Sequence, residues 1–161
     1  MNEDLLALLN KAYFFLKFRP RTEKEIRDYL YKKIRTKHWS RDDAEKVIEE
    51  LKEENLINDE KFIELFVKDR TTLKPKGKKL LTRELKQKGI SDDLIEKYFS
   101  INEIDEEKLA LQILEKRWPR FRSLDSRKRF EKSYRFLISR GFSFDACRKT
   151  IEKLENLSFL K

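Results

Sequence analysis

The sequence predicts an all-α protein made of three tandem three-helix repeats in an elongated, curved array. Three observations support this prediction. A motif recurs three times at a steady spacing, apolar residues follow the helical period nearly everywhere, and the 161 residues include only three Gly and three Pro. Charged residues make up 43% of the chain and hydrophobic residues 39%, a composition that favours helices and still allows each unit a modest core.

The recurring motif is a helix start. A bulky apolar residue is followed by Ser and, two places after the Ser, by Asp. The copies begin at Trp39, Ile90 and Phe142, which are 51 and 52 residues apart. Ser caps free backbone N–H groups at the start of a helix, and Asp in the first turn suits the helix dipole. The apolar residue is expected to pack against another in the next turn. The predicted pairs are Trp39/Ala44, Ile90/Ile95 and Phe142/Cys147. So regular a period indicates a repeated structural unit.

Glycine and proline mark the joints between the predicted helices. Gly89 and Gly141 stand directly before the second and third motifs, where a left-handed residue would end the preceding helix. His38, the only histidine, occupies this column in the first copy, so we interpret it as part of the joint and not as a catalytic group. The prolines are expected at an earlier helix–helix joint in each repeat: Pro20, Pro75 and Pro119.

The remaining helix starts complete the three-helix pattern. First helices are expected to begin at Asn2, Asn58 and Asp105, each with an apolar residue at the fourth helical position, namely Leu6, Phe62 and Leu109. Residues 22–25 form a capping box for the second helix of the first repeat. The later second helices are expected over residues 78–88 and 125–140, with a loop at 121–126. The predicted repeats are residues 1–56, 57–103 and 104–161.

The net charge of +9 is distributed in blocks. Residues 17–37 carry nine basic and three acidic groups (+6), and residues 68–90 and 116–135 each carry nine and two (+7). Between them, residues 38–67 carry four and ten, and residues 91–115 two and eight, so both are −6. Stacked units would place the positive blocks in a row, as an extended basic strip that suits a polyphosphate. A charge-rich surface of the heat-tolerant type would instead intersperse the signs, so we favour nucleic acid or a nucleoprotein as partner.

The sequence offers little for catalysis or metal binding. One His and one Cys cannot supply a zinc tetrad, and no disulfide can form within the chain. Cys147 occupies an apolar helical column and is expected to be a buried, inert thiol. Gly77-Lys78-Lys79 is not a phosphate-binding Walker loop, because Thr72 stands where the motif needs its first Gly and Lys79 where it needs Ser or Thr. We therefore predict no catalytic residue, no metal and no cofactor.

Two further features concern the compartment. The N-terminal stretch carries Glu3 and Asp4, where a secretion signal would need positive charge. No apolar run is long enough to span a bilayer. These features predict a cytoplasmic protein without a membrane segment.

The most distinctive stretch begins at Leu56 and runs to Ser91. It contains an acidic turn before Phe62, then Arg70, the Lys-Pro-Lys-Gly joint and the run Glu-Leu-Lys-Gln-Lys-Gly-Ile. This stretch resembles the middle repeat of the bacterial RecX family, and the likeness extends more loosely over almost the whole chain. The matching residues are Asp59, Phe62, Arg70, Gly77, Glu84, Leu85, Lys88, Gly89 and Ile90. Asn58 replaces the usual first Asp of the turn, Asn55 its Gly, and the Lys-Pro-Lys-Gly joint a more Gly-rich one.

The resemblance implies three tandem three-helix units that bind RecA and lie in the groove of its filament on single-stranded DNA. It also implies a noncatalytic modulator, mainly a negative one, of strand exchange, ATP hydrolysis and coprotease activity, and so a role in DNA repair, recombination and the SOS response. We expect a monomer when the protein is free. The residues expected to face RecA or the DNA backbone are Arg70, Lys74, Lys76, Lys78, Lys79, Arg83, Lys37, Lys88 and Arg140. The signature residues expected to be mainly structural are Asn58, Asp59, Phe62, Gly77, Glu84, Leu85, Gly89 and Ile90.

Two other functions remain open at this level. A helix-turn-helix regulator would insert a recognition helix into the major groove, although the second helices here are mostly Lys and Arg, with Gln87 nearly alone as a base-reading side chain. A DNA-processing enzyme would need carboxylates that converge on metal ions across a cleft. The acidic pairs at 42–43 and 92–93 are better explained as helix-start charges.

Overall fold

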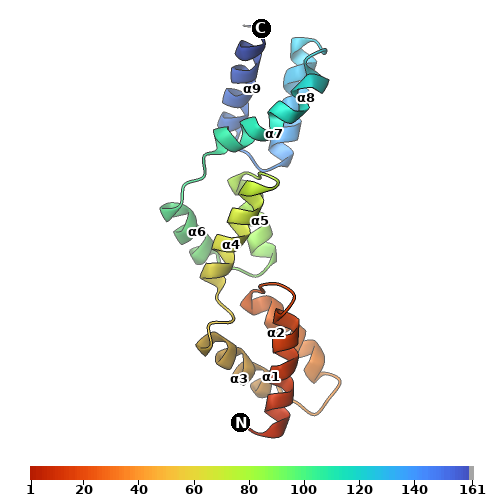
Figure 1. Cartoon of the computed structure of the whole chain (residues 1–161), viewed down its shortest axis with the longest axis vertical. Helices are drawn as coiled ribbons and strands as arrows, with labels where there is room; N and C mark the ends of the chain where they lie inside the picture. Colours follow the sequence, from red (N-terminus) through yellow and green to blue (C-terminus); the bar gives the residue numbers. More distant parts are fainter. Residues whose placement is uncertain (160–161) are drawn as a thin grey trace. The chain divides into compact units, whose positions relative to one another are not determined.

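The computed structural model describes residues 1–159, which form nine α-helices and no strand (Figure 1). The helices are α1 (Glu3–Leu16), α2 (Glu23–Ile34), α3 (Arg41–Glu53), α4 (Asp59–Thr72), α5 (Lys78–Gln87), α6 (Asp92–Ile101), α7 (Glu106–Phe121), α8 (Ser126–Ser139) and α9 (Phe144–Phe159). They fall into three successive sets of three, so the predicted all-α fold of tandem three-helix units is confirmed.

The chain divides into two compact units, and the division passes through the middle set of helices. Unit 1 comprises Met1–Glu64 and Leu85–Glu96, and unit 2 comprises Leu65–Glu84 and the chain from Lys97 onward. Thus α4, α5 and α6 each contribute to both units. The predicted repeat boundaries at 56/57 and 103/104 stay a prediction.

The three Ser-Asp motifs do start helices. Ser40, Ser91 and Ser143 each accept a hydrogen bond from the backbone N–H three residues later, at 3.2, 3.3 and 3.2 Å. All six residues of the predicted apolar pairs are buried. The first helices are capped in the same way by Asn2, Asn58 and Asp105. These caps satisfy N–H groups that have no partner inside the helix, which is why the motif recurs at each start.

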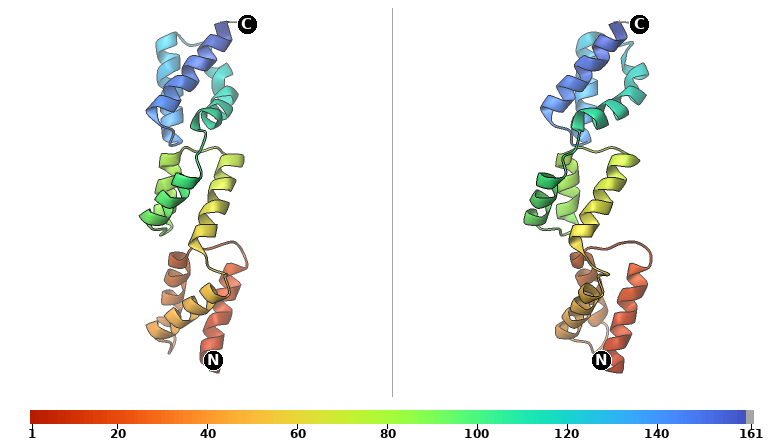
Figure 2. Two further views of the ribbon diagram at one scale, coloured as in Figure 1. Left: turned by 90° about the vertical axis from the view of Figure 1, so that its left-hand side faces the viewer. Right: turned by 60° about the vertical axis from the view of Figure 1, so that its left-hand side comes forward.

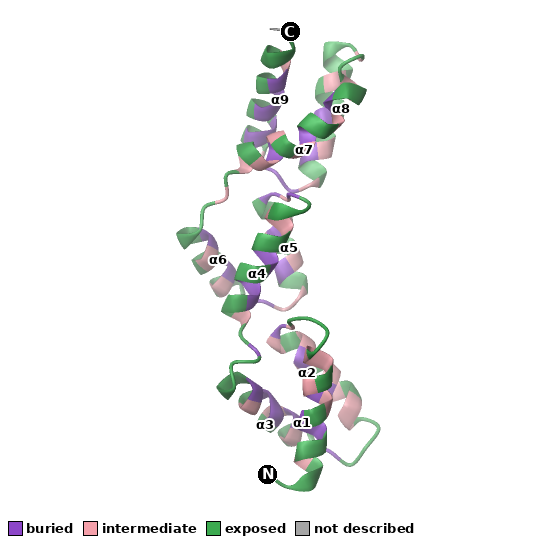
Figure 3. Ribbon diagram, in the orientation of Figure 1, coloured by how far each residue is buried: buried purple, intermediate pink, exposed green. Residues whose placement is uncertain are grey.

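Each unit has a core formed by facing helices. In unit 1, α1, α2 and α3 lie side by side in both views of Figure 2, and their inner faces are buried (Figure 3). This core contains Leu8, Leu9, Ala12, Ile26, Leu30, Ala44, Val47, Ile48 and Leu51. In unit 2 the core of α7, α8 and α9 contains Ala110, Leu114, Trp118, Leu137, Phe142, Cys147, Ile151 and Leu154. Burial raises the pKa of Cys147 to about 11, as expected of an inert thiol.

Some local predictions were wrong. Leu6 is 48% exposed, because Leu8 and Leu9 supply the inner face of α1 instead. Pro119 lies inside the last turn of α7 and not at a joint. The helix continues past it to Phe121. The neighbouring Trp118 is buried, and its indole N–H donates to Ser158 Oγ at 2.7 Å. The loop before α8 is therefore limited to residues 122–125.

The left-handed positions also differ from the expected column. Gly89 and Gly141 have φ values of +85° and +86°, as predicted. Among residues 1–159, the one left-handed residue other than glycine is Asn55, at φ +57° after α3. His38 does not adopt this conformation, and its Nε2 instead lies 3.2 Å from Asp4 Oδ1. The first repeat thus lacks the glycine-type helix end because α2 stops at Ile34, several residues earlier.

Candidate nucleic-acid interface

In unit 2, the connection before α5 is fixed to the end of α8 by main-chain hydrogen bonds. The Gly77 N–H donates to the Arg140 carbonyl at 2.7 Å, and the Lys79 N–H donates to the Gly141 carbonyl at 3.3 Å. A Cβ at position 77 would lie 2.2 Å from the Gly141 carbonyl oxygen, so only glycine fits there. We call this contact the Gly77 junction. It holds the basic residues around it on an anchored backbone.

The cations near the Gly77 junction divide into engaged and unpaired ones. Lys76 Nζ lies 2.5 Å from Glu84 Oε1, and its side chain is only 18% exposed. Arg70 pairs with Asp69 and lies 4.3 Å from the centre of the Phe66 ring. These contacts within unit 2 already occupy the side chains of Lys76 and Arg70, so both residues have a structural role beside any contact with a partner. Arg140 and Lys78 are also placed over aromatic rings, 5.3 Å from Phe136 and 5.4 Å from Phe99.

By contrast, Lys74, Lys79 and Arg83 are exposed and have no ion-pair partner among the described residues. All three belong to unit 2 and lie within ten residues of one another along the chain, on either side of the fixed Gly77. An exposed Lys or Arg whose charge is not paired with a carboxylate is free to contact an anion. The three side chains are therefore accessible to a partner, and we call them the Lys74 cluster.

Unit 1 contains an equivalent contact at the start of α2. The buried Thr22 hydroxyl donates to the Lys88 carbonyl at 2.6 Å, and the Glu23 N–H donates to Asp59 Oδ1 at 3.0 Å. Lys88 Nζ lies 3.6 Å from Glu25. We call this contact the Thr22 junction. Thr22 and Gly77 both directly precede a second helix, and Lys88 and Arg140 both directly precede a left-handed glycine, so the two junctions use the same columns of the repeat.

Carboxylates at the Thr22 junction have shifted pKa values. Burial raises the pKa of Asp59, and the hydrogen bond from the Glu23 N–H only partly opposes it. Burial also acts to raise the pKa of Glu25, but hydrogen bonds from Arg19 and the Thr22 N–H, helped by the charge of Lys88, outweigh it and hold the pKa below its ordinary value. The Lys88 side chain is thus committed in part to Glu25.

The other predicted residues have varied surroundings. Lys37 is exposed and lies 5.7 Å from the centre of the Trp39 ring. The signature residues Phe62, Leu85 and Ile90 are buried, and Asn58 caps α4. Their contacts are those of structural residues.

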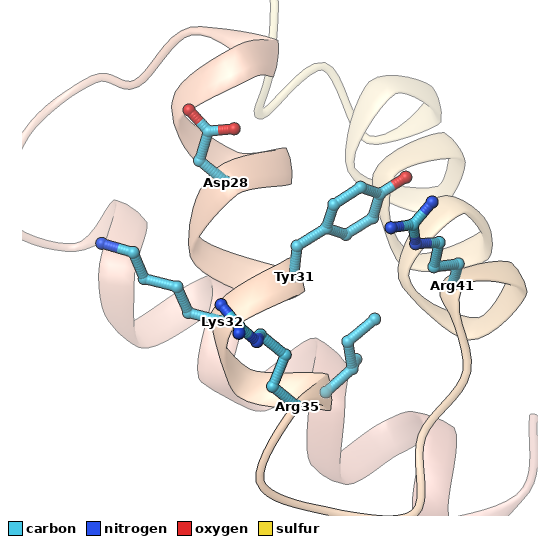
Figure 4. Close-up of a pocket in the computed structure, with 6 residues that line it drawn as sticks. Asp28, Tyr31, Lys32, Arg35 and Arg41 are labelled. Carbon is cyan, nitrogen blue, oxygen red and sulfur yellow. The ribbon is translucent and has the colours of Figure 1, made fainter.

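A basic basin on unit 1 was missed by sequence reasoning (Figure 4). It has a volume of about 550 Å³ and is lined by Asp28, Tyr31, Lys32, Ile34, Arg35 and Arg41. The Tyr31 hydroxyl donates to Glu45 Oε1 at 2.7 Å, and Arg41 lies 5.3 Å from the Tyr31 ring centre. Since Arg27 already pairs with Glu45 and Lys24 with Asp28, the charges of Lys32, Arg35 and Arg41 have no carboxylate partner among residues 1–159. The basin can therefore accept an anionic group.

The sequence contained only part of the signal for this basin. Lys32 and Arg35 belong to the first positive block, whereas Arg41 belongs to the following negative block. The turn between α2 and α3 brings Arg41 to the other side of Tyr31 (Figure 4). Charge counting along the chain could not show this.

Two general properties of the described residues bear on function. In residues 1–159, no helix combines the length and apolar character needed to cross a bilayer. The same part of the chain brings together no group of three or more His, Cys, Asp or Glu side chains that could hold a metal ion.

Known proteins match this chain along nearly its whole length. Three family models match in tandem: "RecX, first three-helix domain" over residues 9–51, "RecX, second three-helix domain" over 58–98 and "RecX, third three-helix domain" over 105–151. A protein named "Regulatory protein RecX" from Clostridium perfringens is 33% identical over 99% of this chain and 74% of its own length. One of the same name from Prosthecochloris aestuarii is 33% identical over 95% of this chain and 97% of its own.

The fold agrees with these matches. The crystal structure of RecX from Lactobacillus salivarius superposes with a TM-score of 0.83 at 27% identity, covering 96% of this chain and 99% of that one. Three consecutive three-helix domains, relatives above 30% identity and a shared fold together establish that the chain belongs to the RecX family of regulatory proteins.

Proposed function

We propose that this protein is a noncatalytic, negative regulator of RecA that binds in the groove of the RecA filament on single-stranded DNA. The observation that carries the proposal is the Lys74 cluster: three exposed, unpaired cations beside a backbone that two main-chain hydrogen bonds fix to α8. Membership of the RecX family supports the same function.

A fixed backbone makes the cluster a better phosphate ligand. Ordering a flexible loop on binding costs free energy, and a segment that is already ordered avoids that cost. Arg83 can also bind a phosphate with two parallel hydrogen bonds. In this proposal, the basin at Arg35 and Arg41 supplies a second phosphate contact from unit 1, so that one contact increases the effective concentration of the other.

The proposal places the protein in the cytoplasm as a monomer, where it slows ATP hydrolysis, strand exchange and the coprotease activity of the filament. Adding it to preformed RecA filaments at substoichiometric ratios should reduce all three activities. No effect at any ratio up to equimolar would contradict the proposal.

A variant with Lys74, Lys79 and Arg83 changed to Ala tests the site. We expect binding to the filament to weaken by at least tenfold at low salt. We also expect the slope of log affinity against log salt to become shallower by about 0.7 for each single-strand phosphate contact that is lost. Binding is measured by sedimentation of filaments over a range of salt concentrations.

The matched control removes the same charge from other exposed positions of the chain: Lys46, Lys61 and Lys153 to Ala. The control should keep most of its affinity. Equal losses in the two triple variants would mean that net charge, and not the Lys74 cluster, determines binding.

A further inference from the structure

Two phenylalanines are exposed at the end of α1. Phe14 is 62% exposed and Phe18 67%. Their ring centroids are 5.2 Å apart in an edge-to-face arrangement. Phe14 lies in the last turn of α1, and Phe18 lies in the connection to α2. The connection is mostly exposed (Figure 3).

This exposure does not result from a lack of apolar partners nearby. The adjacent Phe15 stacks on Tyr29 with ring centroids 4.1 Å apart, and Arg21 lies over its ring at 3.9 Å. The end of α1 and the connection after it therefore place one ring against unit 1 and two rings in solvent. Phe18 lies just past the end of α1, and the edge-to-face contact of its ring with Phe14 joins the two into one aromatic surface.

The surroundings of the pair are cationic. Residues 11–21 contain four basic residues and no acidic one. Arg19 is engaged by Glu25 at 2.7 Å and Arg21 by the Phe15 ring. Lys11 and Lys17, three residues before and after Phe14, have no ion-pair partner among the described residues. The surface thus combines exposed rings with unpaired positive charge.

We propose that Phe14 and Phe18 form a platform on which unpaired bases of single-stranded DNA stack, while Lys11 and Lys17 contact the flanking phosphates. Aromatic rings within a positively charged groove are the usual means of holding a single strand without sequence preference. An apolar protein surface is the poorer occupant, because it would bury Lys11 and Lys17 without neutralising them. The inference takes its ligand, single-stranded DNA, from the proposed function and adds a contact to bases that the Lys74 cluster does not make.

The test uses the whole protein with free oligonucleotides and no RecA. Fluorescence anisotropy compares binding to a (dT)20 strand, to a strand of equal length made of abasic sites, and to a duplex. The abasic strand keeps the phosphates and lacks the bases. We expect (dT)20 to bind at least tenfold more tightly than the abasic strand.

The decisive variant is Phe14→Leu/Phe18→Leu, which keeps apolar bulk and removes the ring faces. It should lose about tenfold affinity for (dT)20 for each stacked base and keep its affinity for the abasic strand. Lys11→Ala/Lys17→Ala should weaken binding to both strands. Because all four side chains lie outside the buried core, circular dichroism and the urea midpoint should stay those of the wild type.

A second measurement locates the contact directly. An oligonucleotide with 5-iododeoxyuridine should crosslink under ultraviolet light to Phe14 or Phe18, as identified by mass spectrometry. Equal binding of (dT)20 by the wild type and the leucine variant would overturn the inference. If the leucine variant keeps its affinity for (dT)20 and loses affinity only for the RecA filament, the inference is also overturned, since the rings would then contact protein.

The oligonucleotide results are independent of the RecA assays. Stacking on free single strands without any effect on RecA activity would overturn the proposed function and leave the platform standing. Regulation of RecA with no ring-dependent binding to single strands would overturn the platform and leave the proposed function standing.

Discussion

The Thr22 junction in unit 1 and the Gly77 junction in unit 2 occupy the same columns of the repeat but are built differently. At the first, a buried side-chain hydroxyl reaches the Lys88 carbonyl. At the second, the main chain itself reaches the Arg140 carbonyl, and two glycines allow the backbones to approach. The comparison shows that the column must supply a donor, and that either a hydroxyl or a bare backbone can do so. It also predicts where each junction is most sensitive.

Gly141→Ala should have the largest effect. The new Cβ would be 2.3 Å from Leu80 Cβ and 2.5 Å from its backbone nitrogen, at a φ of +86°. Left-handed strain and overpacking together should lower the free energy of unfolding by about 4 kcal/mol, measured by urea denaturation. Gly89→Ala has the same φ but meets the Lys24 side chain, part of which can rotate away, so its cost should be about half as large. Equal losses of unfolding free energy in Gly141→Ala and Gly89→Ala would show that the left-handed backbone strain, and not the steric contact, sets the cost.

Thr22→Val should come next. It removes the cap that Thr22 gives to the Glu25 N–H and leaves the Lys88 carbonyl without its donor. We expect a loss of about 2 to 3 kcal/mol. Thr22→Ser keeps the hydroxyl and should retain most of the stability that Thr22→Val loses. A valine variant as stable as the wild type would mean that water replaces the hydroxyl.

Lys76→Ala and Lys88→Ala test the ion pairs of the two junctions. Lys76 is largely buried against Glu84, whose Oε2 already has no hydrogen-bond partner, so its removal should cost about 1 to 2 kcal/mol. Lys88 lies 3.6 Å from Glu25, a looser pair that should contribute less than about 0.5 kcal/mol. If Lys88→Ala proves the more damaging to stability, our ranking of the two pairs is wrong.

The smallest effect should depend on pH. The folded state raises the pKa of Asp59 through burial, so folding is favoured by protonation of this group. Its contribution to stability is fully present below the unfolded pKa and is lost as the pH rises through the folded value. Asp59→Asn should therefore match the wild type near pH 3 and be slightly more stable at pH 8. Urea midpoints over this range provide the measurement, and a difference that shrinks with rising pH would contradict the assignment.

Local features of this fold could be predicted from the sequence, whereas contacts between distant segments could not. The caps at Ser40, Ser91 and Ser143 depend on residues within one helical turn, and a repeated pattern reveals them. The sequence shows Gly77 and Gly141 as separate joints, but their close approach depends on how α5 meets α8. Likewise, charge counts treat Lys74 and Lys76 alike, and only the position of Glu84 separates an exposed cation from a paired one.

Both junctions have one consequence for sequence variation. The acceptor at Lys88 and at Arg140 is a carbonyl oxygen, which every amino acid carries. The hydrogen bonds that join the repeats therefore do not depend on which side chain stands at either position. A neutral substitution at either position would remove a charge from the surface and leave the main-chain acceptor of the junction in place.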